Sequence, residues 1–256
     1  MSSSRGANPS GPFGRGPSIA ATALWGSSGA GREQLLTDEE RTQLAVISSV
    51  VRFKRGARIY REGDRADAVF NIISGVVKSH IILPNETKHI VAFLFADDLI
   101  GLTEEGRYVN SAEAVTAVTG YRIPVPALEN RLRKDAILEF RVICKLCHEL
   151  REAQRHAFLL SRHHALAKTA LFIQMLETHQ ASRGESTEEV YLPMRRTDIG
   201  DYVGLSPEAV SRSFRALASR GVITFRDRRH LKIVSEAQLE SVASEDKGPP
   251  GRASRG

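Results

Sequence analysis

The stretch GLSPEAVSRSFRALASRG, residues 204–221, carries the local signals of a short helix with a defined start and a defined end. Gly204 suits the left-handed turn that ends a preceding helix, and Ser206 can cap the helix that follows. Pro207 fits the first helical turn, where a backbone N–H has no partner, and Gly221 ends the helix. The pattern predicts two consecutive helices joined by a tight turn.

The second of these helices is expected to bury one face. Val210, Phe214 and Leu217 are spaced four and three residues apart, as a buried helical stripe requires. The segment 198–203 forms the preceding short helix, and Leu205 turns into the core. A helix, a glycine turn and a capped helix at this spacing predict a helix-turn-helix, whose second helix can enter the DNA major groove.

With the buried face set, the outward positions on the N-terminal half of this helix are polar. They are Glu208, Ser211, Arg212 and Arg215. Arg can bind guanine through two hydrogen bonds, Glu can accept from cytosine N4, and Ser can contact a thymine methyl or a phosphate. The alternative is a basic helix that is merely solvated.

Positive charge is concentrated in this region. Residues 192–235 hold nine Lys and Arg against four Asp and Glu, whereas residues 37–126 hold eleven against twelve. Residues 224–234 read as a hairpin around Asp227-Arg228-Arg229, a basic wing beside the helix-turn-helix. Phosphate contacts position a protein on DNA without reading sequence. The candidates for such contacts are Arg195, Arg196, Arg215, Arg226, Arg228 and Arg229.

The N-terminal half has the pattern of strands. From Val51 onward, β-branched and aromatic runs are broken at glycines and at Pro84-Asn85, and they continue to Pro124. Short strands at this turn spacing predict a small β-sandwich or barrel. His80 and His89 flank the Pro84-Asn85 hairpin and are expected to share one sheet face. Before the strands, residues 37–40 have a capping-box pattern that opens a short helix.

A helical period begins at about residue 127. Its apolar positions are spaced 3, 4, 3, 4 and 3, which is a heptad seam. We predict that this seam joins two copies of the chain; the alternative is a helix packed on its own domain. A second helix is expected over 165–179. The seam residues are Ile143, Leu146, Leu150, Ala153, Ala157 and Leu160.

Composition excludes several classes of protein. Residues 1–36 and 241–256 are rich in small and polar residues and are predicted to be disordered. Two cysteines do not form a disulfide framework, and no signal peptide or membrane span is evident, so a cytoplasmic location is expected. No triad, metal-protease motif or phosphate loop points to an enzyme.

Together these parts resemble the CRP/FNR family of bacterial transcription regulators over about residues 37–235. The most specific matches are Leu192-Pro193-Met194, Asp198-Ile199-Gly200, Gly204-Leu205 and Glu208-x-x-Ser211-Arg212. The resemblance implies an α+β fold in three parts. A jelly-roll, cyclic-nucleotide-binding-like β-roll would span 37–126 as a sensor-like domain, a dimerisation helix 127–162, and a winged helix-turn-helix 163–240.

The Glu-x-x-Ser-Arg variant resembles the FNR and FixK branches, whose half-site is TTGAT in an inverted repeat. The resemblance implies that Glu208, Ser211 and Arg212 read bases. It further implies a homodimer on double-stranded DNA that activates transcription through RNA polymerase rather than repressing it.

The sensor end departs from two branches of the family. Cyclic-nucleotide members carry a Gly-Glu pair and an Arg-Ser/Thr-Ala tripeptide, but here Leu102 follows Gly101 and the nearest tripeptide is Asn110-Ser111-Ala112. Without that Arg a cyclic phosphate would lose its bidentate partner. The chain also has no cysteine before Cys144, which argues against an N-terminal iron–sulfur cluster. No cofactor is expected.

The string Cys144-Lys145-Leu146-Cys147-His148 matches the C-x-x-C-H pattern of covalent haem attachment. Within a helix, however, Cys144, Cys147 and His148 share one face. Buried or half-buried structural cysteines are the preferred interpretation. A thiol redox switch and a metal site are the alternatives, and a regulator gated by a ligand or by thiol oxidation is the alternative function.

Overall fold

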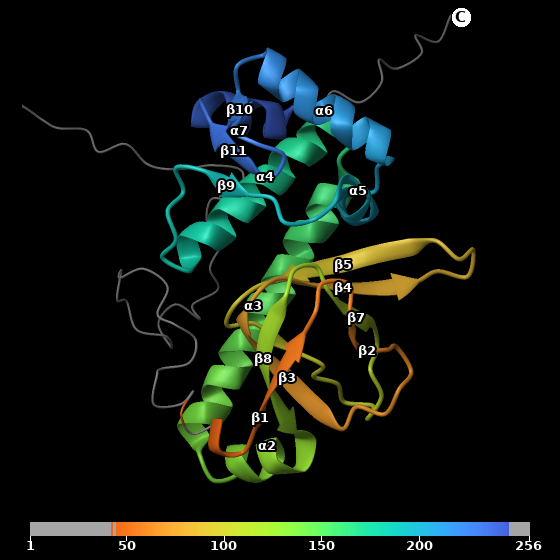
Figure 1. Ribbon diagram of the computed structural model, residues 1–256, viewed down its shortest axis with the longest axis vertical. Coiled ribbons are helices and arrows are strands. Elements are labelled where there is room, and N and C mark those ends of the chain that lie inside the picture. Colours follow the sequence, from red (N-terminus) through yellow and green to blue (C-terminus); the bar gives the residue numbers. More distant parts are fainter. Residues whose placement is uncertain (1–41, 43–44, 246–256) are drawn as a thin grey trace, which may run out of the picture.

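The computed structural model describes residues 42 and 45–245. A β-roll lies at one end of the molecule and the helix-turn-helix region at the other (Figure 1). The long helix α3 (Ala136–Ser161) runs between them along the long axis. None of the helices in this described part of the chain is long and apolar enough to cross a membrane.

The β-roll consists of two antiparallel sheets of four strands. Ile72 and Val118 from the first sheet and Val77 and Ala112 from the second belong to one buried cluster. This is the predicted sandwich. The first sheet has the order β1 (Ser49–Phe53), β8 (Val118–Pro124), β3 (Ala68–Ser74), β6 (Leu99–Ile100), and the second has the order β2 (Arg58–Tyr60), β7 (Ser111–Ala114), β4 (Val77–Ile82), β5 (Lys88–Leu94).

The β4–β5 hairpin corrects one expectation. Leu83 N–H donates to Thr87 O at 3.0 Å, so the loop has three residues, and the last of them, Glu86, has a φ of 63°. A type I turn followed by a left-handed residue is the usual three-residue loop. The extra residue shifts the register by one and pairs His80 with Ile90. His80 and His89 therefore lie on opposite faces of the sheet.

The helical stretch predicted from residue 127 is divided. Helix α2 (Val125–Leu132) ends before a short turn, and α3 begins at Ala136. The Asp135 carboxylate accepts the Leu138 N–H at 3.0 Å, which caps the new helix. The following helix, α4 (Ala165–Ser182), runs one turn beyond its predicted end.

The C-terminal region combines short helices with a three-stranded sheet. Its last helix extends to residue 244 and buries Leu239 and Val242, so residues 241–244 belong to the fold and not to the predicted tail. The predictions for residues 1–36 and 37–40 fall outside the described residues. The elements are β9 (Val190–Tyr191), α5 (Arg196–Val203), α6 (Pro207–Ser219), β10 (Ile223–Phe225), β11 (His230–Ile233) and α7 (Glu236–Ser244).

Candidate nucleic-acid interface

The turn between α5 and α6 is set by two glycines. Gly204 ends α5 with φ 69° and ψ 46°, a left-handed conformation that favours glycine. A Cβ at Gly200 would lie 2.4 Å from Leu205 O, so only glycine lets the turn fold back this closely on α5. Leu205 N–H donates to Gly200 O at 3.0 Å and closes the turn. The relative placement of the two helices is therefore built into the backbone.

Helix α6 begins as the sequence predicts. The Ser206 hydroxyl accepts the Ala209 N–H at 3.2 Å, and Pro207 occupies the first turn. Val210, Phe214 and Leu217 are at most 2% exposed and hold the helix to the core. The opposite face is left to solvent.

The outward positions of α6 differ in accessibility. Glu208, Arg212 and Arg215 are exposed, whereas Ser211 is half-buried. The Ser211 hydroxyl donates to Pro207 O at 2.8 Å, and Arg215 Nε donates to Ser211 O at 3.4 Å. The Ser211 oxygen can still accept a bond. Among the three predicted base readers, Glu208 and Arg212 are therefore the accessible side chains.

The six arginines proposed for phosphate contacts are not equivalent. Arg195 is exposed at the start of α5. The guanidinium of Arg196 instead stacks on the Phe214 ring, 3.9 Å from its centroid, and lies 5.7 Å from that of Phe225. Burial there lowers the pKa of Arg196. Arg196 therefore packs α5, α6 and β10 together, a role the sequence did not indicate.

The wing is a short hairpin with an organised tip. The Asp227 carboxylate accepts from Arg229 N–H at 2.7 Å and contacts His230 Nδ1 at 2.8 Å. These interactions, that of Arg229 first, lower the pKa of Asp227 to about 2. Arg226 pairs with Glu189, and Arg228 and Arg229 are exposed.

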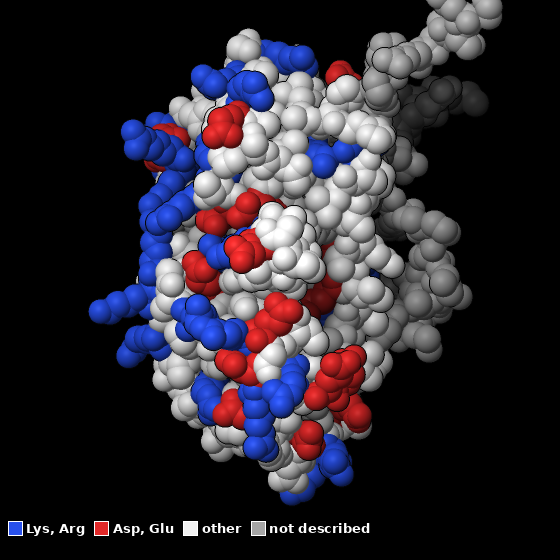
Figure 2. All heavy atoms as spheres, turned by 90° about the vertical axis from the view of Figure 1, so that its right-hand side faces the viewer, with Lys and Arg blue, Asp and Glu red and all other residues white. Residues whose placement is uncertain are grey.

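Figure 2 shows how the charges are distributed over one face of the molecule. Lys and Arg side chains gather at the top and along one edge, whereas acidic and basic side chains alternate over the β-roll below. A basic surface around the helix-turn-helix is the electrostatic footprint of a nucleic-acid-binding protein.

Helix α5 is also attached to the β-roll, through a contact that the sequence analysis did not predict. Lys78 Nζ in β4 lies 2.8 Å from Asp198 Oδ1 in α5 and 3.1 Å from Glu113 Oε1. Burial alone would lower the pKa of Lys78, but the Asp198 and Glu113 carboxylates raise it. Nearby, the rings of Phe93 and Tyr202 pack with centroids 5.2 Å apart. A lysine in an alternating strand gives no sequence signal for such a contact.

The predicted dimer seam lies on the open side of α3. Ile143, Leu146 and Leu150 are 47%, 44% and 61% exposed, and Ala153 and Ala157 are exposed as well. Leu160 is the exception, because it packs against the core of the helix-turn-helix region. Ile137 and Phe140 are also exposed near the start of the helix, but their three-residue spacing carries them away from the seam face.

The cysteines on α3 differ from each other. Cys144 is half-buried, and burial raises the pKa of its thiol. Cys147 is exposed, which corrects the expectation that both would be at least half-buried. Within the described residues no three His, Cys, Asp or Glu side chains are grouped as metal ligands.

The β-roll contains a cavity of about 400 Å³ that borders α3. The tripeptide at 110–112 lies beside it with its polar groups engaged, since Tyr60 Oη donates to Asn110 Oδ1 at 3.2 Å and Glu62 N–H donates to Ser111 Oγ at 3.0 Å. The described residues that line the cavity include Glu149 and Asp98 but neither Lys nor Arg. Burial raises the pKa of Glu149 to about 7.

Comparison with known proteins agrees with this arrangement. A family model described as "Crp-like helix-turn-helix domain" matches residues 157–242, and one described as "Cyclic nucleotide-binding domain" matches residues 50–135. The chain is 30% identical to the nitrogen fixation regulation protein FixK of Bradyrhizobium diazoefficiens over 194 residues, 76% of this chain and 81% of that protein. It is also 30% identical to the transcriptional activator protein anr of Pseudomonas aeruginosa over 173 residues, 67% of this chain and 71% of that protein. The solved structure of FixK2 from Bradyrhizobium japonicum superimposes with a TM-score of 0.72 at 26% identity and covers 78% of this chain and 98% of its own.

Proposed function

The chain belongs to the CRP/FNR family of DNA-binding transcription regulators and resembles its FixK-like members, and on this premise we propose that it binds a TTGAT-type inverted repeat as a homodimer. It is a regulator and not an enzyme. The observation that carries the proposal is the first half of α6, where Glu208 and Arg212 are exposed on a helix whose other face is fully buried.

Each base reader has a matching partner in the half-site. Arg212 binds the guanine of TTGAT through O6 and N7, and Glu208 accepts from N4 of the paired cytosine. Ser211 contacts a thymine methyl or a phosphate. Arg196 supports helix α6, which carries the base-reading side chains. The phosphates of the DNA backbone are contacted by Arg195, Arg215, Arg226, Arg228 and Arg229.

The exposed stripe on α3 supports the homodimer. Several apolar side chains on one face of a long helix are unusual at the surface of a monomer, and a second copy of the same helix would cover them. A two-fold axis along this seam places two α6 helices on one face of DNA, about one helical turn apart. The same geometry accounts for an inverted repeat as the target.

The remaining parts of the proposal follow the relatives. We place the protein in the cytoplasm, as an activator that contacts RNA polymerase. The β-roll acts without a cyclic nucleotide, because acidic groups and no Lys or Arg line its described cavity. It acts without an N-terminal iron–sulfur cluster, because no cysteine precedes Cys144.

A second candidate function is supported by the β-roll cavity itself. With about 400 Å³ of space against the proposed dimer helix, it has the size of a small-molecule site. In that case DNA binding is conditional on an effector. Alternatively, oxidation of the exposed Cys147 next to the seam controls DNA binding.

A titration of the purified chain on a TTGAT-N4-ATCAA duplex at fixed salt tests these proposals, with a scrambled duplex as control. Specific binding by the reduced protein without ligand is the expected result. Loss of binding on mild oxidation would favour control of DNA binding by thiol oxidation. Absence of specific binding in both states would contradict the proposed half-site or show that an effector is required.

A further inference from the structure

Lys168 is a buried lysine without an anionic partner, near the start of α4. The residue is 8% exposed, and its ammonium group makes no hydrogen bond or ion pair with the described residues. Burial alone lowers the pKa of this group, and no carboxylate raises it. Since Nζ is not one of the enclosed polar atoms without a partner, it reaches the surface at the end of a covered stem.

The ammonium group lies beside the turn of the helix-turn-helix. Lys168 Nζ is 3.6 Å from the point where a Cβ on Gly204, between α5 and α6, would be. Ser206, which caps α6, follows shortly after in the chain. Figure 1 shows α4 starting at this same end of the molecule. Lys168 thus stands next to the proposed DNA-reading helix, although it belongs to a different one.

The first turn of α4 adds to the positive potential around Lys168. Backbone N–H groups at the start of a helix have no partner within it, and this end carries a partial positive charge. The side chain of His164 makes no capping bond to this turn, which contains no acidic residue. Helical side chains lean toward the start of their helix, so the Lys168 ammonium adds a full charge at this end.

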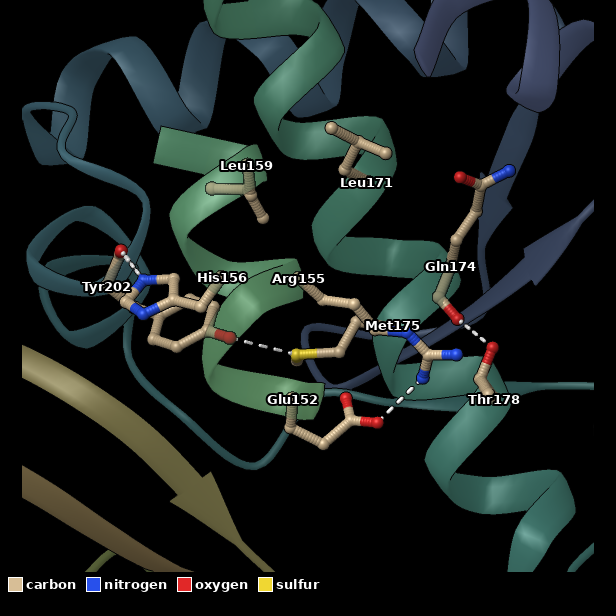
Figure 3. A pocket seen from close by; sticks show the side chains of 9 residues that line it. All are labelled: Glu152, Arg155, His156, Leu159, Leu171, Gln174, Met175, Thr178 and Tyr202. Atoms are coloured by element: carbon tan, nitrogen blue, oxygen red, sulfur yellow. Dashed lines mark hydrogen bonds and ion pairs between the residues drawn. The ribbon is translucent and has the colours of Figure 1, made fainter. Parts of the chain in front are cut away.

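The joint behind Lys168 holds a second basic group. Figure 3 shows the His156 imidazole against the Tyr202 ring, with Nε2 2.7 Å from Tyr202 O. Burial lowers the pKa of His156, and the charge of Lys168 lowers it further. The Glu152 carboxylate of this joint lies 2.6 Å from Arg155 and is already paired. An anion at the surface would therefore offset the burial of Lys168 and its repulsion of His156.

We propose that Lys168 and the first turn of α4 bind one phosphate of the DNA backbone, next to the bases that α6 reads. The assignment rests on the proposed function, because DNA docked on α6 brings the phosphodiester to this point. The ammonium group acts as a point charge, and the helix start supplies N–H donors. Such a contact positions α6 without reading sequence. It extends the DNA-binding surface to the helix that directly follows α3.

Lys168→Met tests the contact, because it keeps a covered apolar stem and removes the charge. Fluorescence anisotropy on the TTGAT repeat and on the scrambled duplex, over a series of NaCl concentrations, measures the effect. Both affinities should fall by the same factor, at least about tenfold at roughly 0.1 M salt, and the slope of log K against log salt should become shallower by about two, or one contact per subunit. Stability in urea should not fall, since folding disfavours the charge. The matched control is Lys134→Met, at an exposed position between α2 and α3.

Acetylation of the unmodified chain by acetic anhydride, followed by peptide mass spectrometry, decides even if Lys168→Met fails to fold. The duplex should slow acetylation of Lys168 severalfold and leave Lys134 unchanged. Excess inorganic phosphate without DNA should have no such effect, and equal protection by it would contradict a DNA contact.

Two results of the salt titration would overturn the site: an unchanged slope in Lys168→Met, or a loss of affinity for the repeat alone. Either one, with specific binding by the unmodified chain, refutes the contact and leaves the proposed function standing. If the unmodified chain binds neither duplex, the proposed function fails and the phosphate contact fails with it.

Discussion

The base recognition that we propose depends on a few side chains whose directions are set by local interactions. The cap at Ser206 and the buried residues of α6 orient the helix, and this leaves Glu208 and Arg212 exposed on its first turns. Arg196 shows the limit of such reasoning, because its charge suggested a phosphate contact while its guanidinium stacks on Phe214.

Arg212→Ala should remove discrimination between the TTGAT repeat and a scrambled duplex. The variant loses the two hydrogen bonds to guanine, which corresponds to about 1–3 kcal/mol per half-site. Fluorescence anisotropy on both duplexes measures the difference. Arg228→Ala, at the exposed tip of the wing, should weaken binding to both duplexes alike. If Arg212→Ala still preferred the repeat, the assignment of this residue would be wrong.

The raised pKa of the Glu149 carboxyl group predicts that the stability of the protein depends on pH. Burial raises the pKa of its carboxyl group from 4.5 to about 7, so folding favours the protonated form. Its contribution to stability is fully present below pH 4.5 and is lost as the pH rises through 7.

Glu149→Gln, which is neutral at every pH, should therefore stabilise the protein at pH 8 by about 2 kcal/mol and change little at pH 5. Urea unfolding at the two pH values measures this. The control is Glu188→Gln, at an exposed position near β9. An equal effect of Glu149→Gln at both pH values would contradict the explanation.

At the scale of elements, α3 has two faces with different tasks. One face packs against the β-roll and α4 through Leu138, Val142 and Leu159, which are buried. The other carries the exposed stripe that we assign to a second copy. The helix can serve both because it is long enough to pass beyond the β-roll to the helix-turn-helix region (Figure 1).

Leu150→Glu should prevent dimer formation, because a two-fold seam would place two carboxylates in an apolar contact. Sedimentation equilibrium should show a monomer, and binding to the inverted repeat should fall with it. Arg151→Glu places a carboxylate one position further, outside the seam, with an even larger change of charge, and should leave the dimer intact. A dimer that persists in Leu150→Glu would place the interface elsewhere.

At the scale of the whole molecule, the β-roll and the helix-turn-helix region are joined by a buried ion pair. Lys78 and Asp198 are 120 residues apart in sequence and 2.8 Å apart in space. Asp198 also accepts the Arg195 N–H at 3.1 Å, so the same carboxylate holds the start of α5. The orientation of α5, and of α6 behind it, is thus tied to strand β4.

Lys78→Met should destabilise the protein by about 3 kcal/mol, because it leaves a buried carboxylate without its cation. Lys78→Met combined with Asp198→Asn should recover part of this loss, since residue 198 is then neutral and Glu113 keeps its ion pair with Lys88 at 3.4 Å. Glu185→Gln, which removes an exposed ion pair with Arg183, should cost less than about 1 kcal/mol. Urea unfolding compares the four proteins. A double variant no more stable than Lys78→Met would argue against coupling of the two residues.

Much of the fold and of the outward face of α6 followed from the sequence, because those features depend on neighbours in the chain. Caps, glycine turns and helical spacing act over three or four residues, and they identified α6, its buried face and the wing. The register of the β4–β5 hairpin did not follow, because one extra loop residue reverses the faces of His80 and His89. The break before α3 likewise depended on a single cap at Asp135.

The sequence by itself determined the succession of β-roll, long helix and helix-turn-helix, together with the identity of the residues that face outward on α6. Tertiary structure alone decided which charges are buried and which cavities form. Lys78 meets Asp198, Arg196 stacks on two rings, and Lys168 is buried beside Gly204 only once distant segments pack together. The reason is physical: periodicity shows which side of an element is buried, whereas the partner on that side belongs to another part of the chain.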